Sequence, residues 1–98
     1  MIVLTLNFDK TGLITGYKVE GHSDLAESGQ DIVCAAVSAI TQTPILGLER
    51  HLKRHIVYKI FDGVLNVKLD KADELTQAIL ASMQFAMQDV ASKYPENV

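Results

Sequence analysis

The chain has 98 residues, of which 48% are hydrophobic, and a formal net charge of −3 at pH 7. A chain of this size can build one hydrophobic core, so we predict a single domain over residues 1–98. The negative charge argues against direct nucleic-acid binding, because that binding depends largely on Lys and Arg neutralising phosphates. We find no cationic segment followed by an apolar stretch at the N-terminus and no run of about 18 apolar residues. We therefore expect no signal peptide, no membrane association and a cytoplasmic location.

The first predicted elements are two β-strands. Residues 2–8 (IVLTLNF) and 13–19 (LITGYKV) alternate between apolar and polar side chains and contain β-branched members. The intervening sequence DKTG supplies residues that favour a turn. This pattern predicts an antiparallel hairpin.

A helix is predicted next, because from Ile32 onward the apolar positions recur every three or four residues. Such spacing places them on one buried stripe of a helix: Val33, Val37, Ile40, Pro44 and Leu48. Pro44 removes one helical hydrogen bond and clashes with the preceding turn. We therefore expect a kink near Ile40–Thr41 rather than two separate helices.

A second hairpin and a second helix complete the pattern. Residues 56–61 (IVYKIF) and 64–69 (VLNVKL) flank Asp62-Gly63, a strong signal for a tight hairpin. Asp70 is the expected N-cap of a helix that Pro95 ends, with Asp73 three residues after the cap. The predicted fold class is α+β, an α/β sandwich of ββαββα order in which two long helices cover an antiparallel sheet.

The second predicted helix is apolar around more than half of its circumference, which is more than one sheet face requires. We attribute the surplus, in particular Leu80, Met83 and Met87, to a homodimer interface. Burial of the same residues under a loop of the chain is the alternative.

Cys34 is the chain's only cysteine, so no internal disulfide is possible and a structural zinc site would lack ligands. We expect neither a metal nor a cofactor. If Asp31 is the N-cap of the first helix, Cys34 lies among the unpaired amides at the positive end of the helix dipole, where a thiolate is stabilised. If Ser28 is the N-cap, Cys34 lies about one turn deeper and the effect is weaker.

Two other side chains are candidates for a site with Cys34. His22 follows the second strand, and the glycine-flanked loop can return the chain so that strand end and helix start are neighbours. Ser38 lies four residues after Cys34, on the same helical face. The alternative readings are structural, because a buried cysteine is common, a histidine at a strand end is often a surface residue and a helical serine often bonds its own backbone.

The pair Gly21-His22, the block GQDIVCAAVS at residues 29–38 and the ββαββα order together resemble the Prp family of ribosomal-processing cysteine proteases. The resemblance implies an α/β homodimer that removes the N-terminal extension of a large-subunit ribosomal protein, the twenty-seventh in the usual series, during ribosome assembly. It also implies a catalytic dyad of Cys34 and His22. The family's other site positions fall on Asp31 and Ser38, with Gly21 and Gly29 in the two matching blocks.

The chain departs from the family pattern at Ser23, where we expect a small apolar residue, usually alanine. The loop from Ser23 to Gln30 is a plausible lid over an extended peptide. Its acids Asp24 and Glu27, together with Glu20, would favour the lysine-rich start of a ribosomal protein.

Two other classes of function compete with a protease. A non-catalytic ribosome-associated binding module would use the basic cluster RHLKRH, Arg50 to His55, on RNA. The same cluster is also explained by favourable charge at the negative end of a helix dipole. A thiol redox or persulfide carrier would need Cys34 but not His22.

Overall fold

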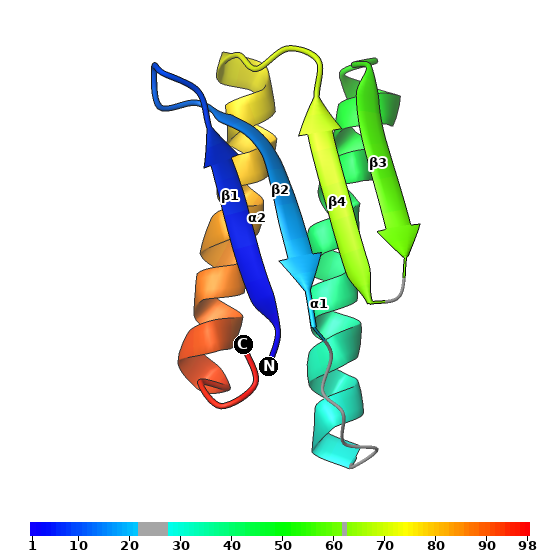
Figure 1. Ribbon diagram of the computed structural model, residues 1–98, viewed down its shortest axis with the longest axis vertical. Coiled ribbons are helices and arrows are strands. Elements are labelled where there is room, and N and C mark those ends of the chain that lie inside the picture. Colours follow the sequence, from blue (N-terminus) through cyan, green and yellow to red (C-terminus); the bar gives the residue numbers. More distant parts are fainter. Residues whose placement is uncertain (22–27, 62) are drawn as a thin grey trace.

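The computed structural model describes residues 1–21, 28–61 and 63–98, with the backbone alone at 28–31. The elements follow the predicted order (Figure 1). They are β1 (Val3–Phe8), β2 (Ile14–Glu20), α1 (Ser28–Leu46), a π-helical turn η1 (Gly47–His51), β3 (Ile56–Phe61), β4 (Val64–Leu69) and α2 (Glu74–Lys93).

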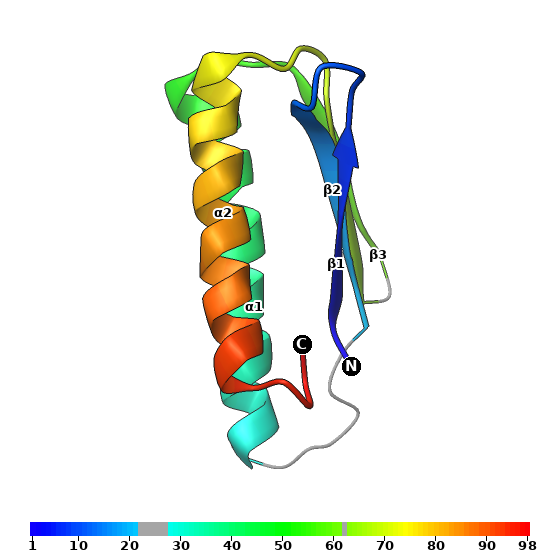
Figure 2. The same cartoon turned by 90° about the vertical axis from the view of Figure 1, so that its left-hand side faces the viewer.

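The four strands form one antiparallel sheet in the order β1-β2-β4-β3. The two helices lie side by side on one face of this sheet, and no described helix or strand covers the other face (Figure 2). Both predicted hairpins and the two-layer α+β architecture are therefore confirmed. The central pair β2 and β4 connects the two hairpins, with Tyr17 opposite Val67 and Val19 opposite Leu65.

Asp9 organises the turn of the first hairpin. Its carboxylate Oδ1 accepts hydrogen bonds from the amide of Thr11 at 2.8 Å and the amide of Leu13 at 3.0 Å. Gly12 follows with a φ of 89°, a conformation that glycine adopts without steric cost. The DKTG sequence thus forms the turn that its composition predicts.

The first helix starts earlier than the apolar stripe indicates. It begins at Ser28 and continues through Pro44 to Leu46 without separating into two helices. The departure from α-helical geometry comes after Pro44, in the π-helical turn η1. Residues Ile32–His51 are long and apolar enough by composition to cross a membrane, with mean hydropathy 1.5. Val33, Val37, Ile45 and Leu48 of this segment pack in the protein core, which explains part of its apolar character.

The second helix begins at Glu74, and its N-cap is Asp73 rather than the predicted Asp70. The Asp73 carboxylate accepts from the amides of Leu75 and Thr76, and the Thr76 hydroxyl accepts from the amide of Asp73 at 2.9 Å. The amide of Asp70 instead donates to the carbonyl of His55, as an extension of the β3–β4 pairing. The helix ends at Lys93 with Tyr94 as C-cap, just before Pro95 as predicted.

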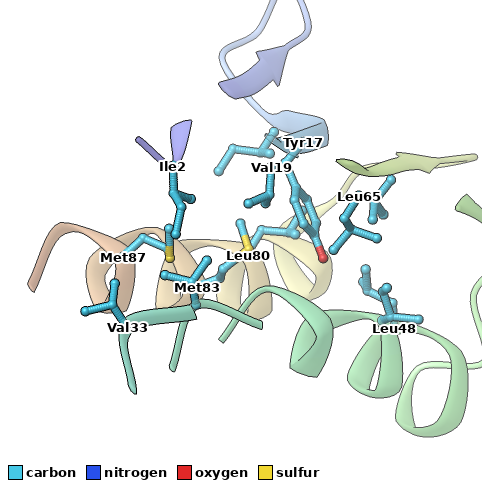
Figure 3. Close-up of a cluster of buried hydrophobic side chains, with 13 residues drawn as sticks. Ile2, Tyr17, Val19, Val33, Leu48, Leu65, Leu80, Met83 and Met87 are labelled. Carbon is cyan, nitrogen blue, oxygen red and sulfur yellow. The ribbon is translucent and has the colours of Figure 1, made fainter. Parts of the chain in front are cut away.

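The core lies between the sheet and the helix layer (Figure 3). Leu80 is fully buried, and Met83 and Met87 are each 3% exposed. The prediction that these three form a surplus face for a dimer is wrong, because they fill the chain's own core. The core residues from the sheet side are Ile2, Ile14, Tyr17, Val19, Leu65 and Val67.

Candidate active site

A cleft with a volume of about 180 Å³ lies at the end of the sheet where β2 finishes and the β3–β4 hairpin turns. One wall is the sheet and the other is α1. Its lining is mostly apolar on the sheet side and carries Cys34 on the helix side. The lining residues are Ile2, Val19, Gly21, Cys34, Val37, Ser38, Thr41, Gln42, Ile60, Gly63, Val64 and Leu65.

Cys34 is half-buried in this wall and packs against the core. It lies six residues after Ser28, where the helix begins, so its own amide is inside the α-helical hydrogen-bond ladder. The helix begins at Ser28, so its unsatisfied amides include those of residues 28–30, all at least four residues before Cys34. The structure thus favours the deeper of the two predicted placements, and the helix-dipole argument for a stabilised thiolate is correspondingly weak.

Ser38 and Gln42 follow Cys34 at intervals of four residues and line the same cleft. In the part of the chain that the structure describes, the Ser38 hydroxyl forms no hydrogen bond. The hydroxyls of Thr41 and Ser82, by contrast, each donate at 2.8 Å to the carbonyl four residues earlier. The exposed Ser38 hydroxyl is therefore available to a bound molecule.

Tyr17 fixes α1 over the sheet beside this cleft. Its side chain is fully buried, and its hydroxyl donates to the Thr41 carbonyl at 2.6 Å. Burial raises the pKa of Tyr17 above its usual range, so the hydroxyl stays a donor at neutral pH. This hydrogen bond joins β2 to α1 and so fixes the position of one cleft wall relative to the other.

Gly21 forms the cleft wall where the chain leaves β2. Its φ is 92°, which strains any residue with a Cβ. A Cβ there would also overlap the backbone carbonyl oxygen of Met1. Gly21 is one of the predicted site residues, and this steric requirement explains why glycine occupies the position.

Four predicted site residues lie outside the described residues: His22, Ser23, Asp24 and Glu27. Gly29 and Asp31 belong to the first turn of α1, and the Asp31 side chain is likewise outside the description. His22 follows Gly21 directly in the sequence, and Gly21 lines the cleft with Cys34. Glu20 forms an ion pair with Lys18 at 3.5 Å.

The other two histidines lie away from the cleft. His51 ends η1, and the His55 carbonyl bonds to Asp70 at the beginning of β3. The cleft is lined by Ile60 and Gly63, at the opposite end of that strand. Neither His51 nor His55 is therefore placed to act on Cys34.

The basic cluster from Arg50 to His55 is not a simple patch of exposed charge. The Arg54 guanidinium is held by the Asp73 carboxylate at 2.6 Å, with both side chains less than one-third exposed. This pair connects the end of the first helical segment to the N-cap of α2. It gives Arg54 a structural role, which weakens the case for an RNA-binding surface.

Sequence reasoning missed the parts of the cleft that come from distant segments. Ile60, Gly63 and Val64 enter through the β3–β4 hairpin, and only the strand order could have placed them beside Cys34. Gln42 had a usable signal, because it lies eight residues after Cys34 on the same helical face. Among the described residues, no cluster of three or more His, Cys, Asp or Glu could hold a metal ion.

Comparison with known proteins places this fold in a family. The sequence matches the family described as Cysteine protease Prp over residues 1–98. The ribosomal processing cysteine protease Prp of Staphylococcus aureus is 30% identical over 102 residues, which cover 100% of this chain and 95% of that protein.

Solved structures agree with the sequence match. A crystal structure of the S. aureus protease with a substrate peptide has a TM-score of 0.89 at 25% identity, covering 99% of this chain and 94% of that one. A second, with a covalently linked product peptide, has a TM-score of 0.87 at 27% identity, covering 99% and 94%. A Streptococcus mutans protein has a TM-score of 0.85 at 28% identity, covering 98% and 91%.

Proposed function

The chain belongs to the Prp family of cysteine proteases, and on that premise we propose that it removes the N-terminal extension of a ribosomal protein with Cys34 as nucleophile and His22 as general base. The substrate we propose is the large-subunit ribosomal protein that is twenty-seventh in the usual series. We place this reaction in the cytoplasm, where ribosomes assemble.

One observation carries the proposal. Cys34 is the chain's only cysteine, and its half-buried side chain lies in the wall of a cleft. A cysteine protease needs a thiolate nucleophile, and this sequence offers no other. The covalently linked product peptide in the S. aureus protease supports a mechanism through a covalent intermediate.

In the proposed reaction, the Cys34 thiolate attacks the scissile carbonyl and forms a thioester as the peptide C–N bond breaks. His22 takes the thiol proton and gives a proton to the leaving amine. Water then hydrolyses the thioester. His22 is supported by its position directly after Gly21 and by the distance of His51 and His55 from the cleft.

The negative charge of the tetrahedral intermediate needs a hydrogen-bond donor close to Cys34. The Cys34 amide is inside the helical ladder, and the helix-start amides lie one turn or more away. The Ser38 hydroxyl lies one turn after Cys34, in the same cleft, and forms no other hydrogen bond among the described residues. Ser38 is therefore the donor we propose for the oxyanion.

We also propose a homodimer, but through a different surface from the predicted one. A groove of about 550 Å³ is lined by residues of both α1 and α2. Ile40, Pro44, Leu46 and Ile79 are among its lining residues. Residues 32–48 and 75–88 carry no charged side chain, and Phe85 on α2 is 65% exposed. An uncharged surface of this kind favours a second copy of the same surface over a charged partner.

The decisive experiment is incubation of the protein with the extended ribosomal protein, followed by mass measurement of the product. We expect one new species, shorter by the N-terminal extension, with the wild type and none with Cys34→Ala. Cleavage by Cys34→Ala at the wild-type rate would contradict the assignment of the nucleophile. No cleavage by the wild type would contradict the proposed substrate.

A further inference from the structure

The outer edge of β3 is an exposed strand edge beside the cleft. β3 is the last strand of the sheet and pairs only with β4 among the described strands (Figure 1). Four of its six residues are apolar and more than 40% exposed: Val57 67%, Tyr58 43%, Ile60 61% and Phe61 72%. Natural proteins usually protect such edges with several charges, a proline or a covering segment. Lys59 is the only charged residue here.

The register shows which backbone groups face outward. The Asp70 amide donates to the His55 carbonyl, so pairs two residues apart along the ladder also exchange hydrogen bonds. Val57, Lys59 and Phe61 therefore bond to β4, and the amide and carbonyl groups of Tyr58 and Ile60 point away from it. No hydrogen bond outside the β3–β4 ladder involves Tyr58 or Ile60 in the described part of the chain.

The side chains of the same two residues face the helix layer. Tyr58 is opposite Val67 and Ile60 is opposite Leu65, and both partners are buried core residues. Ile60 also lines the cleft that contains Cys34. Ile60 therefore belongs both to the exposed strand edge, through its backbone, and to the cleft, through its side chain.

The other edge of the sheet is less available near the cleft. The amide of Ile2, immediately before β1, donates to the Asn97 carbonyl at 2.7 Å. The C-terminal segment thus occupies the β1 edge at the end of the sheet where the cleft lies (Figure 1). Among the described strands, β3 therefore has the open edge that leads into the cleft.

We propose that an extended segment of the substrate binds as a fifth strand on β3, hydrogen-bonded to the backbone of Tyr58 and Ile60. This inference rests on the proposed protease function and deepens it. Strand addition supplies main-chain hydrogen bonds that do not depend on sequence. Every second substrate side chain then faces the helix layer and packs beside Tyr58 and Ile60. From there the substrate chain continues into the cleft. The strand runs on to the scissile bond at Cys34.

The test uses wild-type protein and a peptide that spans the cleavage site, N-methylated at one backbone position at a time. We expect kcat/KM to fall about 5- to 10-fold at alternate positions on one side of the scissile bond, because each such methyl group removes one hydrogen bond to β3. Methyl groups at the intervening positions should have little effect. A profile without this alternation overturns strand addition, although cleavage itself would still support the proposed function.

A protein variant gives an independent readout. Ile60→Pro removes the outward amide without removing a bond to β4, and proline is tolerated on edge strands. We expect KM to rise about 5- to 10-fold with Ile60→Pro. It should stay near the wild-type value with the control Val57→Ala, whose exposed side chain lies on the opposite face of β3. If Ile60→Pro instead halves the mass of the protein in sedimentation, the β3 edge is a contact between subunits and the proposal is wrong.

Discussion

The side chain of Gln77 in α2 hydrogen-bonds both backbone groups of Ile14 at the start of β2. Ile14 donates its amide to Gln77 Oε1 at 2.7 Å, and Gln77 Nε2 donates to the Ile14 carbonyl at 2.9 Å. Ile14 lies beside an irregularity in the β1–β2 register, between Asn7 and Phe8. The carboxamide therefore satisfies strand groups next to this irregularity and joins the two layers of the fold.

Replacing this carboxamide should destabilise the protein. We expect Gln77→Ala to lower the free energy of unfolding by about 2 kcal/mol, since two partly buried hydrogen bonds of about 1 kcal/mol each are lost. Gln77→Glu keeps the acceptor and loses the donor. Its free energy of unfolding should therefore lie between those of the wild type and Gln77→Ala. Urea unfolding measures both, and Gln88→Ala, at an exposed position of the same helix, is the control. Equal midpoints for Gln77→Ala and the wild type would contradict the role.

The pairing of layers through Gln77 was not visible in the sequence, whereas the strands themselves were. The alternation in residues 56–61 and 64–69 gave the second hairpin its observed bounds. Periodicity depends on neighbouring residues alone, so a short stretch of sequence is enough to recognise it. The N-cap of α2 could not be identified in this way, because Asp70 and Asp73 both fit the sequence pattern. Thr76 and the distant Arg54 select Asp73.

The same difference holds for the site. Cys34 and Ser38 were predictable because their helical spacing places them on one face. Ile60 and Gly63 were not, because their proximity to Cys34 depends on β4 lying between β2 and β3. The prediction that the apolar face of α2 forms a dimer interface was also wrong, because the sequence does not show how much of a helix is buried against its own sheet. Leu80 is fully buried there.

The capping carboxylate of α2 gives stability a dependence on pH. The Arg54 hydrogen bond, followed by the backbone amide of Thr76, holds the pKa of Asp73 below its usual value of 3.8. A group with a lowered folded-state pKa stabilises the fold above its unfolded pKa and loses that contribution as the pH falls through the folded value. We therefore expect the wild-type urea midpoint to fall more between pH 5 and pH 2 than that of Asp73→Asn. Parallel pH profiles for the two proteins would contradict this linkage.

The dimer surface is tested by charge. Phe85→Glu places a carboxylate on the uncharged outer face of the helix layer and should halve the mass measured by sedimentation at micromolar concentration. Val57→Glu changes an equally exposed apolar residue on the uncovered face of the sheet and should leave the mass unchanged. Leu80→Lys should unfold the chain rather than separate subunits, because Leu80 is a core residue. A wild type that sediments as a monomer would remove the proposal.

Ser38 is tested through the split between kcat and KM. If its hydroxyl binds the oxyanion, Ser38→Ala should lower kcat about 10²- to 10³-fold with little change in KM, because the bond exists only when charge develops. The free energy of unfolding should stay within about 0.5 kcal/mol of the wild type, as expected for an exposed hydroxyl. Ser82→Ala, at an exposed serine of α2, is the control for activity. An unchanged kcat would assign the oxyanion to another donor.

Replacing the two members of the proposed dyad should give losses of cleavage activity that do not add. Cys34→Ala should abolish cleavage while the protein stays folded, since alanine fits a helix position among the small residues Ala35 and Ala36. His22→Ala should reduce turnover about 10²- to 10⁴-fold, the usual contribution of general acid–base catalysis. The double variant should be no slower than Cys34→Ala, because nucleophile and base act as one unit.

The matched controls for the histidine are His51→Ala and His55→Ala, which change the two histidines away from the cleft and should cleave at the wild-type rate. His22→Ala should still be alkylated by iodoacetamide at Cys34, because the thiol remains. A thiol redox or persulfide carrier needs the cysteine but not the histidine, and full cleavage by His22→Ala would contradict the role of His22 as general base. Loss of activity in His22→Ala with its thiol intact distinguishes a protease dyad from such a carrier.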